Sequence, residues 1–391
     1  MDIEKLKAAI AKNIDSSSQK LGELSQKIHD NPETAMQEHQ ASGWLVEFLK
    51  ENGFKVEKGI AGLPTAFKAS YGKAKPVIAF LAEYDALPKI GHGCGHNLIG
   101  TSAVAAGLGT KLAVDELGGS IIVFGTPAEE VDAGKATMAK KGAFDGLDAA
   151  MIVHPGGGNR VTLNALACQT LNVEFFGKAA HAAADPELGI NALEAMILSF
   201  NAIDALRQHI REKARIHGII TDGGEAANIV PAHTAGTFIA RAQDDAYLDD
   251  LKVRVLNCFT GAALATGARL EYHWAPERYA SMLNNVTLAR LFQNNFESLG
   301  HPIPIGEDEE WSGSTDVGNV SQLTPTIQPM VGIAPPHILI HSTEFAEVAG
   351  TKKALHIILD SAKAMAMTAA ELLANPNTLS AVRADYEKNK K

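Results

Sequence analysis

Three continuous apolar runs constrain the fold of this chain more than any other feature. They lie at residues 76–81, 120–125 and 149–153. Strands buried on both faces of a parallel sheet have this continuous pattern, whereas half-exposed strands alternate between apolar and polar residues. The segments between the runs, about 101–117 and 133–141, are expected to be helices. Alternating buried strands and helices predict an α/β domain with a mainly parallel sheet.

The middle of the chain has a different pattern. We expect strands at 171–176, 215–222, 228–243 and 269–274, and helices at 189–208 and 244–266. This order, βαββαβ, is that of a ferredoxin-like α+β unit. We therefore predict an inserted domain at residues 168–282, within a larger domain formed by residues 1–167 and 283–391.

Three further segments of the larger domain carry expectations. Apolar residues recur near a 3.6-residue period over 3–28, which predicts one N-terminal helix. A long terminal helix is expected over 351–375, followed by a frayed tail at 388–391. The acidic cluster 307–310 is expected to be a solvated loop.

Composition and charge exclude several classes of protein. The formal net charge of −10 argues against a nucleic-acid partner, because binding phosphates requires a basic surface. No apolar run approaches the roughly 18 residues that span a bilayer, and the N-terminus lacks the apolar core of an export signal. The chain has only three cysteines, without the spacing of a disulfide framework. We expect a cytoplasmic protein with no membrane partner.

A glycine-rich turn, Gly91-His92-Gly93-Cys94-Gly95-His96-Asn97, follows the first apolar run. Glycine lets a backbone turn tightly, so Cys94 and His96 can point into one small volume. Thiolate sulfur and imidazole nitrogen suit zinc and its first-row neighbours. The alternatives are an ordinary connection, a Cys–His nucleophile pair, or a phosphate-binding turn that lacks the full glycine fingerprint.

Further metal-ligand candidates follow the next two apolar runs and lie near the C-terminal end of the chain. Glu129 and Glu130 are adjacent, so one can bind a metal while the other takes a proton from a water; a solvated pair at a helix start is the alternative. His154 follows the third run, and His341 lies much later, with His337 as a competitor. Five donors then suit two metal ions about 3.5–4 Å apart: Cys94, His96, Glu130, His154 and His341.

The remaining candidates concern the substrate. His181 is either a surface histidine or part of the site, and Asn228 and Arg241 flank a predicted strand. Arginine presents a fork of donors that matches a carboxylate, so these two residues are candidates to hold a substrate carboxylate. Gly313 and Ser314 either contact the substrate or only form a turn that caps a helix.

These motifs resemble those of the aminoacylase/carboxypeptidase-type metallopeptidases, peptidase family M20, in the amidohydrolase branch that has a cysteine metal ligand. The resemblance covers nearly the whole chain. Its most specific segments are 83–88, 92–97, 127–130 and 313–318. It implies a zinc-peptidase-like catalytic domain and an inserted domain that serves as a lid and dimerisation surface.

The resemblance also implies roles for individual residues. Cys94, His96, Glu130, His154 and His341 would bind two divalent metal ions per chain (zinc or manganese, with cobalt possible), and Asp85 would orient a ligand. Glu129 would be the general base. His181 would stabilise an oxyanion, and Asn228 and Arg241 would bind the substrate carboxylate.

The predicted function is metal-dependent hydrolysis of an amide bond in a dipeptide or an N-acyl or N-aryl-acyl amino acid with a free carboxylate. A homodimer is expected, with a tetramer as the alternative. The alternative function is that of a non-catalytic binding or assembly protein on the same scaffold.

Overall fold

The computed structural model describes residues 2–306 and 311–390, so the acidic cluster 307–310 lies outside the described residues. The chain forms two compact units. The main unit comprises Met1–Asn164, Met282–Ser312 and Asp316–Lys391, and the inserted unit comprises Ala165–Ser281 and Gly313–Thr315. Within the described ranges, no helix is both long enough and apolar enough to cross a membrane.

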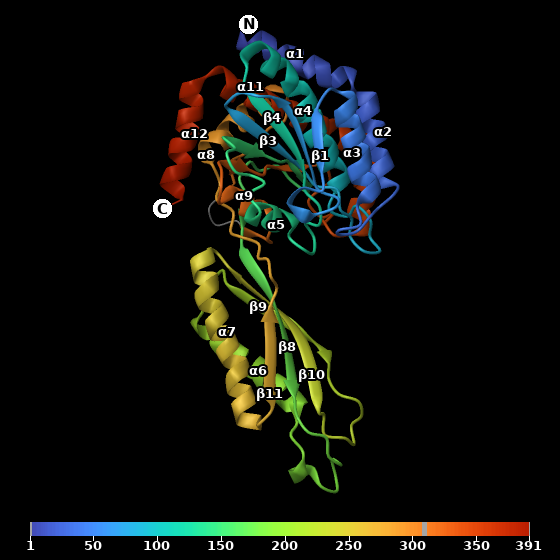
Figure 1. The fold of residues 1–391 in the computed structure, drawn as a ribbon, viewed down its shortest axis with the longest axis vertical. Coiled ribbons are helices and arrows are strands. Elements are labelled where there is room, and N and C mark those ends of the chain that lie inside the picture. The colour runs from blue at the N-terminus through green and yellow to red at the C-terminus, as the bar shows by residue number, and fades with distance from the viewer. Residues whose placement is uncertain (1, 307–310, 391) are drawn as a thin grey trace. The chain divides into compact units, whose positions relative to one another are not determined.

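The main unit is built on a six-stranded sheet with the strand order β1-β2-β4-β3-β5-β13 (Figure 1). The four strands from β4 to β13 run parallel, and β1 and β2 add an antiparallel edge. This confirms the predicted α/β class with a mainly parallel sheet. The strands are β1 (Lys55–Lys58), β2 (Phe67–Gly72), β3 (Val77–Ala82), β4 (Ser120–Gly125), β5 (Ala149–Met151) and β13 (Thr326–Ile327).

Helices cover both faces of this sheet. In β3, Ile78 and Phe80 belong to the large core that includes α4 and α11, while Ala79 and Leu81 belong to the opposite core with α5 and α9. The continuous apolar runs follow from burial on both faces. The helices of the main unit are α1 (Ile3–Ser16), α2 (Ser18–His29), α3 (His39–Glu51), α4 (His96–Leu117), α5 (Gly134–Lys140), α8 (Val286–Ser298), α9 (Val317–Ser321), α10 (Thr343–Ala349), α11 (Lys352–Ala374) and α12 (Pro376–Asn389), with a 3₁₀ turn, η1 (Ile60–Gly62).

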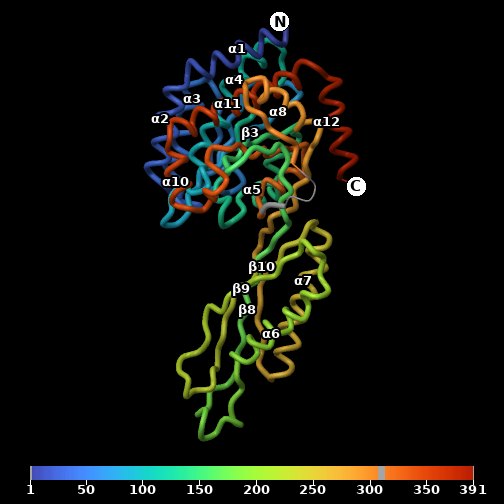
Figure 2. The backbone as a smooth tube through the Cα atoms, turned by 180° about the vertical axis from the view of Figure 1, so that it is seen from behind, coloured from blue at the N-terminus to red at the C-terminus, as the bar shows by residue number. Residues whose placement is uncertain are grey.

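Two helical predictions need correction. The single helix expected over 3–28 is two helices, α1 and α2, that meet at Ser17. Ser16 Oγ donates to the Asn13 carbonyl (2.7 Å), the kind of back-bonding that bends and weakens a helix. Helix α12, seen in red in Figure 2, was not expected and extends to Asn389, into the tail predicted to be frayed. The Asn375 side chain caps its N-terminus.

The inserted unit has the βαββαβ order of a ferredoxin-like fold. Its four antiparallel strands lie in the order β11-β8-β10-β9, and α6 and α7 pack together on one face. The elements are β8 (Ala167–Phe176), α6 (Ala192–Leu206), β9 (Arg215–Asp222), β10 (His233–Ala242), α7 (Asp245–Thr266) and β11 (Arg269–Trp274), with 3₁₀ turns η2 (Pro186–Leu188) and η3 (Arg207–His209).

Four short strands complete the description. In the main unit, β6 (His154–Gly156) pairs in parallel with β14 (Met330–Gly332). Strands β7 (Asn164–Ala165) and β12 (Trp311–Ser312) belong to the segments that connect the two units along the chain.

Candidate metal centre

The carboxyl ends of three parallel strands bring the predicted donors together. The Cys94–His96 turn follows β3, the two glutamates follow β4, and His154 follows β5. Since the carboxyl ends of parallel strands meet at one edge of a sheet, these side chains converge there. His96 is the first residue of α4, and Gly95 before it has φ +77. A Cβ at Gly95 would lie 2.5 Å from Pro155 Cγ, so only glycine fits this turn.

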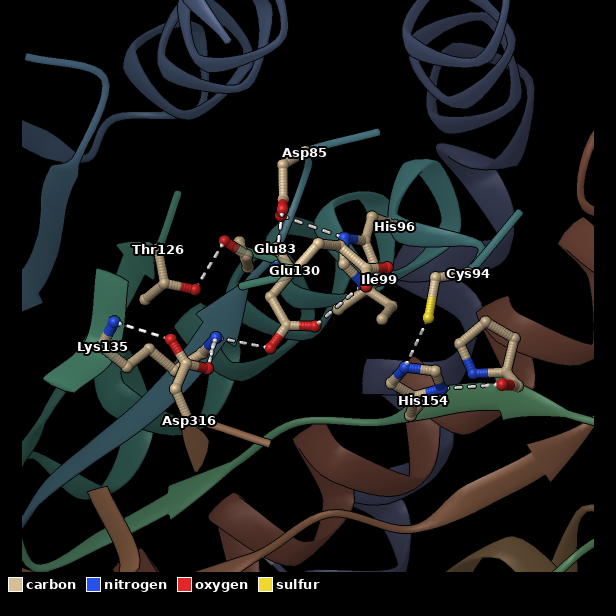
Figure 3. A network of polar contacts seen from close by, with 12 residues as sticks. Glu83, Asp85, Cys94, His96, Ile99, Thr126, Glu130, Lys135, His154 and Asp316 are labelled. Carbon is tan, nitrogen blue, oxygen red and sulfur yellow. Dashed lines mark hydrogen bonds and ion pairs between the residues drawn. The ribbon is translucent and has the colours of Figure 1, made fainter. Parts of the chain in front are cut away.

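Cys94 lies at the centre of the donor cluster. It forms one group with His96 and His154 and another with Glu130 and His341, and in each group the donor atoms lie within 4.8 Å of one another. Cys94 Sγ is 3.4 Å from His154 Nε2, as Figure 3 shows. Glu130 spans two histidines, with Oε1 3.8 Å from His96 Nε2 and Oε2 3.4 Å from His341 Nε2. One thiolate and one carboxylate therefore stand between two adjacent donor groups.

The donor atoms fit divalent metal ions. His96 Nε2 and Glu130 Oε1 are buried and have no hydrogen-bond partner, which is costly unless a cation binds them. His154 Nδ1 lies 2.7 Å from the Pro155 carbonyl oxygen and donates to it, so Nε2 is left with its lone pair toward Cys94. Burial lowers the pKa of His154 to about 4, so its ring is in the neutral, metal-binding form at pH 7. Burial raises the pKa of the Cys94 thiol, so the thiolate form requires an adjacent cation.

Asp85 holds two of these donors in place. Its Oδ1 lies 3.0 Å from His96 Nδ1, and its Oδ2 accepts from the Glu130 backbone N–H at 3.1 Å. A carboxylate on the far nitrogen of a histidine fixes the tautomer that presents the near nitrogen to a metal. Burial alone would raise the pKa of Asp85, but His96 lowers it below its ordinary value, so the carboxylate stays charged.

His341 joins the cluster from the C-terminal part of the chain. Its backbone N–H donates to the Gly93 carbonyl at 2.8 Å, which ties it to the glycine-rich turn. Its φ of +67 is a strained value for a residue with a Cβ, and such strain is common at functional sites. His337, the competing candidate, is exposed and joins none of the donor groups formed by the described residues.

A buried lysine among carboxylates lies next to the donor cluster, and it was not among the residues expected to form the site. Lys135 Nζ is 2.5 Å from Glu83 Oε1 and 2.6 Å from Asp316 Oδ1 (Figure 3). Glu129 belongs to the same acidic group as Glu83 and Asp316, and it is 8% exposed. Burial and the charges of Glu83 and Asp316 raise the pKa of Glu129 well above its ordinary value. A lysine in a short alanine-rich helix gives no sequence signal of such burial.

The substrate candidates lie in the inserted unit. His181 is exposed, and its Nδ1 accepts from the backbone N–H groups of Ala183 and Ala184 at 3.2 and 3.1 Å. In the neutral ring, the proton is therefore on Nε2, which makes that nitrogen a donor. Asn228 is close by, because its carbonyl accepts from Ala182 N at 3.0 Å.

Arg241 and Ser314 form a second group in the inserted unit. Arg241 Nη1 donates to Ser314 Oγ at 2.7 Å, and the Gly313 carbonyl accepts from Leu166 N at 3.0 Å. Asn228 precedes the first residue of β10, whereas Arg241 is next to its last residue. At about 3.4 Å per residue, the eight steps from His233 to Arg241 span roughly 27 Å. Asn228 and Arg241 of one copy are too far apart to hold the same carboxylate.

A buried set of Cys, His and Glu donors at the carboxyl edge of an α/β sheet defines a metal-dependent hydrolase class. The sequence pattern of Peptidase family M20/M25/M40 matches residues 79–364. The chain belongs to this family, and it is a metallo-amidohydrolase of the kind the family contains.

Curated relatives cover most of the chain. The "Xaa-Arg dipeptidase" of Mus musculus is 38% identical over 403 residues, covering 99% of this chain and 93% of the relative. One of the two subunits of the p-aminobenzoyl-glutamate hydrolase of Escherichia coli is 34% identical over 335 residues, covering 80% of this chain and 68% of the relative.

Solved structures share the fold. A putative aminohydrolase from methicillin-resistant Staphylococcus aureus has a TM-score of 0.76 at 18% identity and covers 94% of this chain and 100% of that one. A dinuclear metal-binding M20 peptidase from Bacillus subtilis has a TM-score of 0.64 at 19% identity, covering 92% and 99% respectively.

Proposed function

We propose that this protein hydrolyses the amide bond of a dipeptide, or of a related N-acyl amino acid, that has a free carboxylate. The observation that carries the proposal is the grouping of Cys94, His96 and His154 beside Glu130 and His341, with Cys94 common to both groups. Five donors arranged around a shared thiolate suit two divalent ions, zinc or manganese, with cobalt as a third candidate.

The metal ions, when bound, would polarise the amide carbonyl and acidify the attacking water. Glu129 takes the proton of that water and passes it to the leaving nitrogen. Its raised pKa supports this role, because burial and the neighbouring carboxylates increase its affinity for a proton. Asp85 keeps His96 and Glu130 oriented through its two hydrogen bonds.

The substrate carboxylate is bound by Arg241, with Gly313 and Ser314 beside it, and by Asn228. Since Asn228 and Arg241 stand at opposite ends of β10, the two groups come from different copies of the chain. In this proposal a homodimer forms the complete site, and the neighbouring copy supplies His181 and Asn228. His181 Nε2–H then donates to the developing oxyanion, an interaction worth about 3–4 kcal/mol in comparable sites.

The relatives narrow the choice of substrates. The mouse Xaa-Arg dipeptidase matches nearly the whole chain at higher identity than the bacterial aminobenzoyl-glutamate hydrolase subunit. Dipeptides with a C-terminal arginine are therefore the first substrates to test, and aminobenzoyl-glutamate is the second. All three cysteines are free thiols, which supports a reducing compartment such as the cytoplasm.

The test is mass-spectrometric hydrolysis of a mixed panel after addition of zinc or manganese. The panel contains dipeptides with basic and neutral C-terminal residues, N-acyl amino acids and aminobenzoyl-glutamate, and Glu129→Gln is the control. We expect cleavage that requires both added metal and Glu129. Metal-loaded wild-type protein that leaves every amide intact would contradict the proposal.

A further inference from the structure

The pocket next to the donor cluster already contains a cation that belongs to the chain. Lys135 is 0% exposed, and lysine is almost never fully buried unless it is paired. One oxygen from each of Glu83, Glu129 and Asp316 lies within 4.8 Å of the others, a group that can hold a metal ion. The Lys135 ammonium lies against two of these carboxylates, at 2.5 Å from Glu83 and 2.6 Å from Asp316.

The local backbone is built to place this ammonium. Ala133 has φ +48, and a Cβ at Gly134 would lie 1.9 Å from the Pro127 carbonyl oxygen. This close approach brings the start of α5 against the turn that leads to Glu129. The Lys135 backbone N–H then donates to Asp316 Oδ2 at 2.8 Å, so one residue holds both oxygens of Asp316.

The charges explain why a fixed cation is needed here. Glu83, Glu129 and Asp316 are all buried, and like-charged carboxylates repel strongly where water cannot screen them. Glu83 also reaches the donor cluster, with Oε2 3.6 Å from His96 Nε2. Without a cation, Glu129 would be pushed out of place or protonated, and Glu83 would be free to turn toward the metal ions.

We propose that Lys135 is a positioning residue for Glu129, and that its ammonium takes the place of a third metal ion among Glu83, Glu129 and Asp316. The inference rests on the proposed function, in which Glu129 is the base. A cation carried by a side chain keeps Glu129 in place whatever the metal supply, and it prevents the acidic group from binding an additional ion.

The first test compares Lys135→Met with Lys363→Met. Lys363 is the matched control, because it is 6% exposed and pairs with Asp15 and Asp360 at 2.6 and 2.8 Å, on α11. We expect Lys135→Met to lower kcat by about a hundredfold, the effect of a small misplacement of a catalytic group. The KM and the metal content should stay close to those of the wild type, and Lys363→Met should keep its kcat. A Lys135→Met protein with wild-type kcat, or an equal loss in Lys363→Met, would overturn the proposal.

The second test does not depend on activity. Lys135→Ala removes the ammonium and leaves three carboxylates around an empty space. After dialysis against manganese, we expect Lys135→Ala to hold one more metal ion per chain than the wild type by plasma mass spectrometry. Adding Asp316→Asn should abolish the extra ion. Equal metal content in wild type and Lys135→Ala would refute the role of Lys135 as a substitute cation.

The two tests separate this inference from the proposed function. If metal-loaded wild-type protein hydrolyses no amide, the proposed function fails, and the metal count alone decides the role of Lys135. If the wild type is active and neither lysine variant changes kcat or metal content, only the inference about Lys135 fails. The metal count also decides if Lys135→Met does not fold.

Discussion

Replacing Asp85 with asparagine tests whether one buried carboxylate orients the metal ligands. Asp85 is 1% exposed and binds His96 Nδ1 at 3.0 Å and the Glu130 N–H at 3.1 Å. Asparagine keeps the shape but has one acceptor oxygen, and its amide group faces the second donor. Losing one buried, charge-assisted hydrogen bond costs about 1.5–3 kcal/mol. If that loss falls on the metal-bound state, it corresponds to a rise in metal Kd of about 10–100-fold.

The assay is competition between the metal-stripped protein and a chelator of known affinity, for wild type and Asp85→Asn. Asp148→Asn is the matched control. Asp148 is 3% exposed and accepts from the Val77 N–H at 2.7 Å, but it belongs to none of the donor groups formed by the described residues. We expect weaker binding in Asp85→Asn alone. An unchanged Kd in Asp85→Asn, or an equal rise in Asp148→Asn, would refute the reasoning.

Three further predictions follow from the structure. Gly134→Ala places a Cβ 1.9 Å from the Pro127 carbonyl oxygen and should destabilise the protein by at least about 1–3 kcal/mol, measured by chemical denaturation; unchanged stability would contradict the close approach. Mixing inactive His181→Ala with inactive Glu129→Gln should restore about a quarter of the wild-type sites if subunits exchange at random in a dimer, and no recovery after verified exchange would rule out the shared site. The Val77 N–H and Arg383 lower the pKa of Asp148, although burial raises it, so its contribution to stability is present above about pH 4 and is lost as the pH falls through its folded-state pKa; Asp148→Asn should therefore lose less Tm on acidification than wild type, and an equal loss would contradict this.

The sequence predicts the donor cluster well because its members follow consecutive buried strands. Apolar runs that end at Glu83, Thr126 and His154 are visible in the sequence, and parallel strands place their carboxyl ends at one edge of a sheet. The inserted unit is also predictable, because a βαββαβ order specifies its topology. The break between α1 and α2 is less visible, since three serines in a row continue the helical spacing of apolar residues on either side.

Two features could not be read from the sequence for physical reasons. The burial of Lys135 depends on Glu83 and Asp316, which are far from it along the chain and close only after folding. The separation of Asn228 from Arg241 follows from the length of β10, and it changes the meaning of the predicted carboxylate site from one copy to two. Sequence order identifies such residues as candidates, but the distance between them is a property of the folded strand.

The most direct test of the two-metal mechanism is a titration of turnover against bound metal. Metal-stripped protein is loaded stepwise with manganese or zinc, and hydrolysis of a dipeptide is measured together with metal content, for wild type and Glu129→Gln. We predict that turnover rises until two metal ions are bound per chain, and that Glu129→Gln binds the same metal without turnover. Full turnover in the stripped protein, or in Glu129→Gln, would contradict the mechanism.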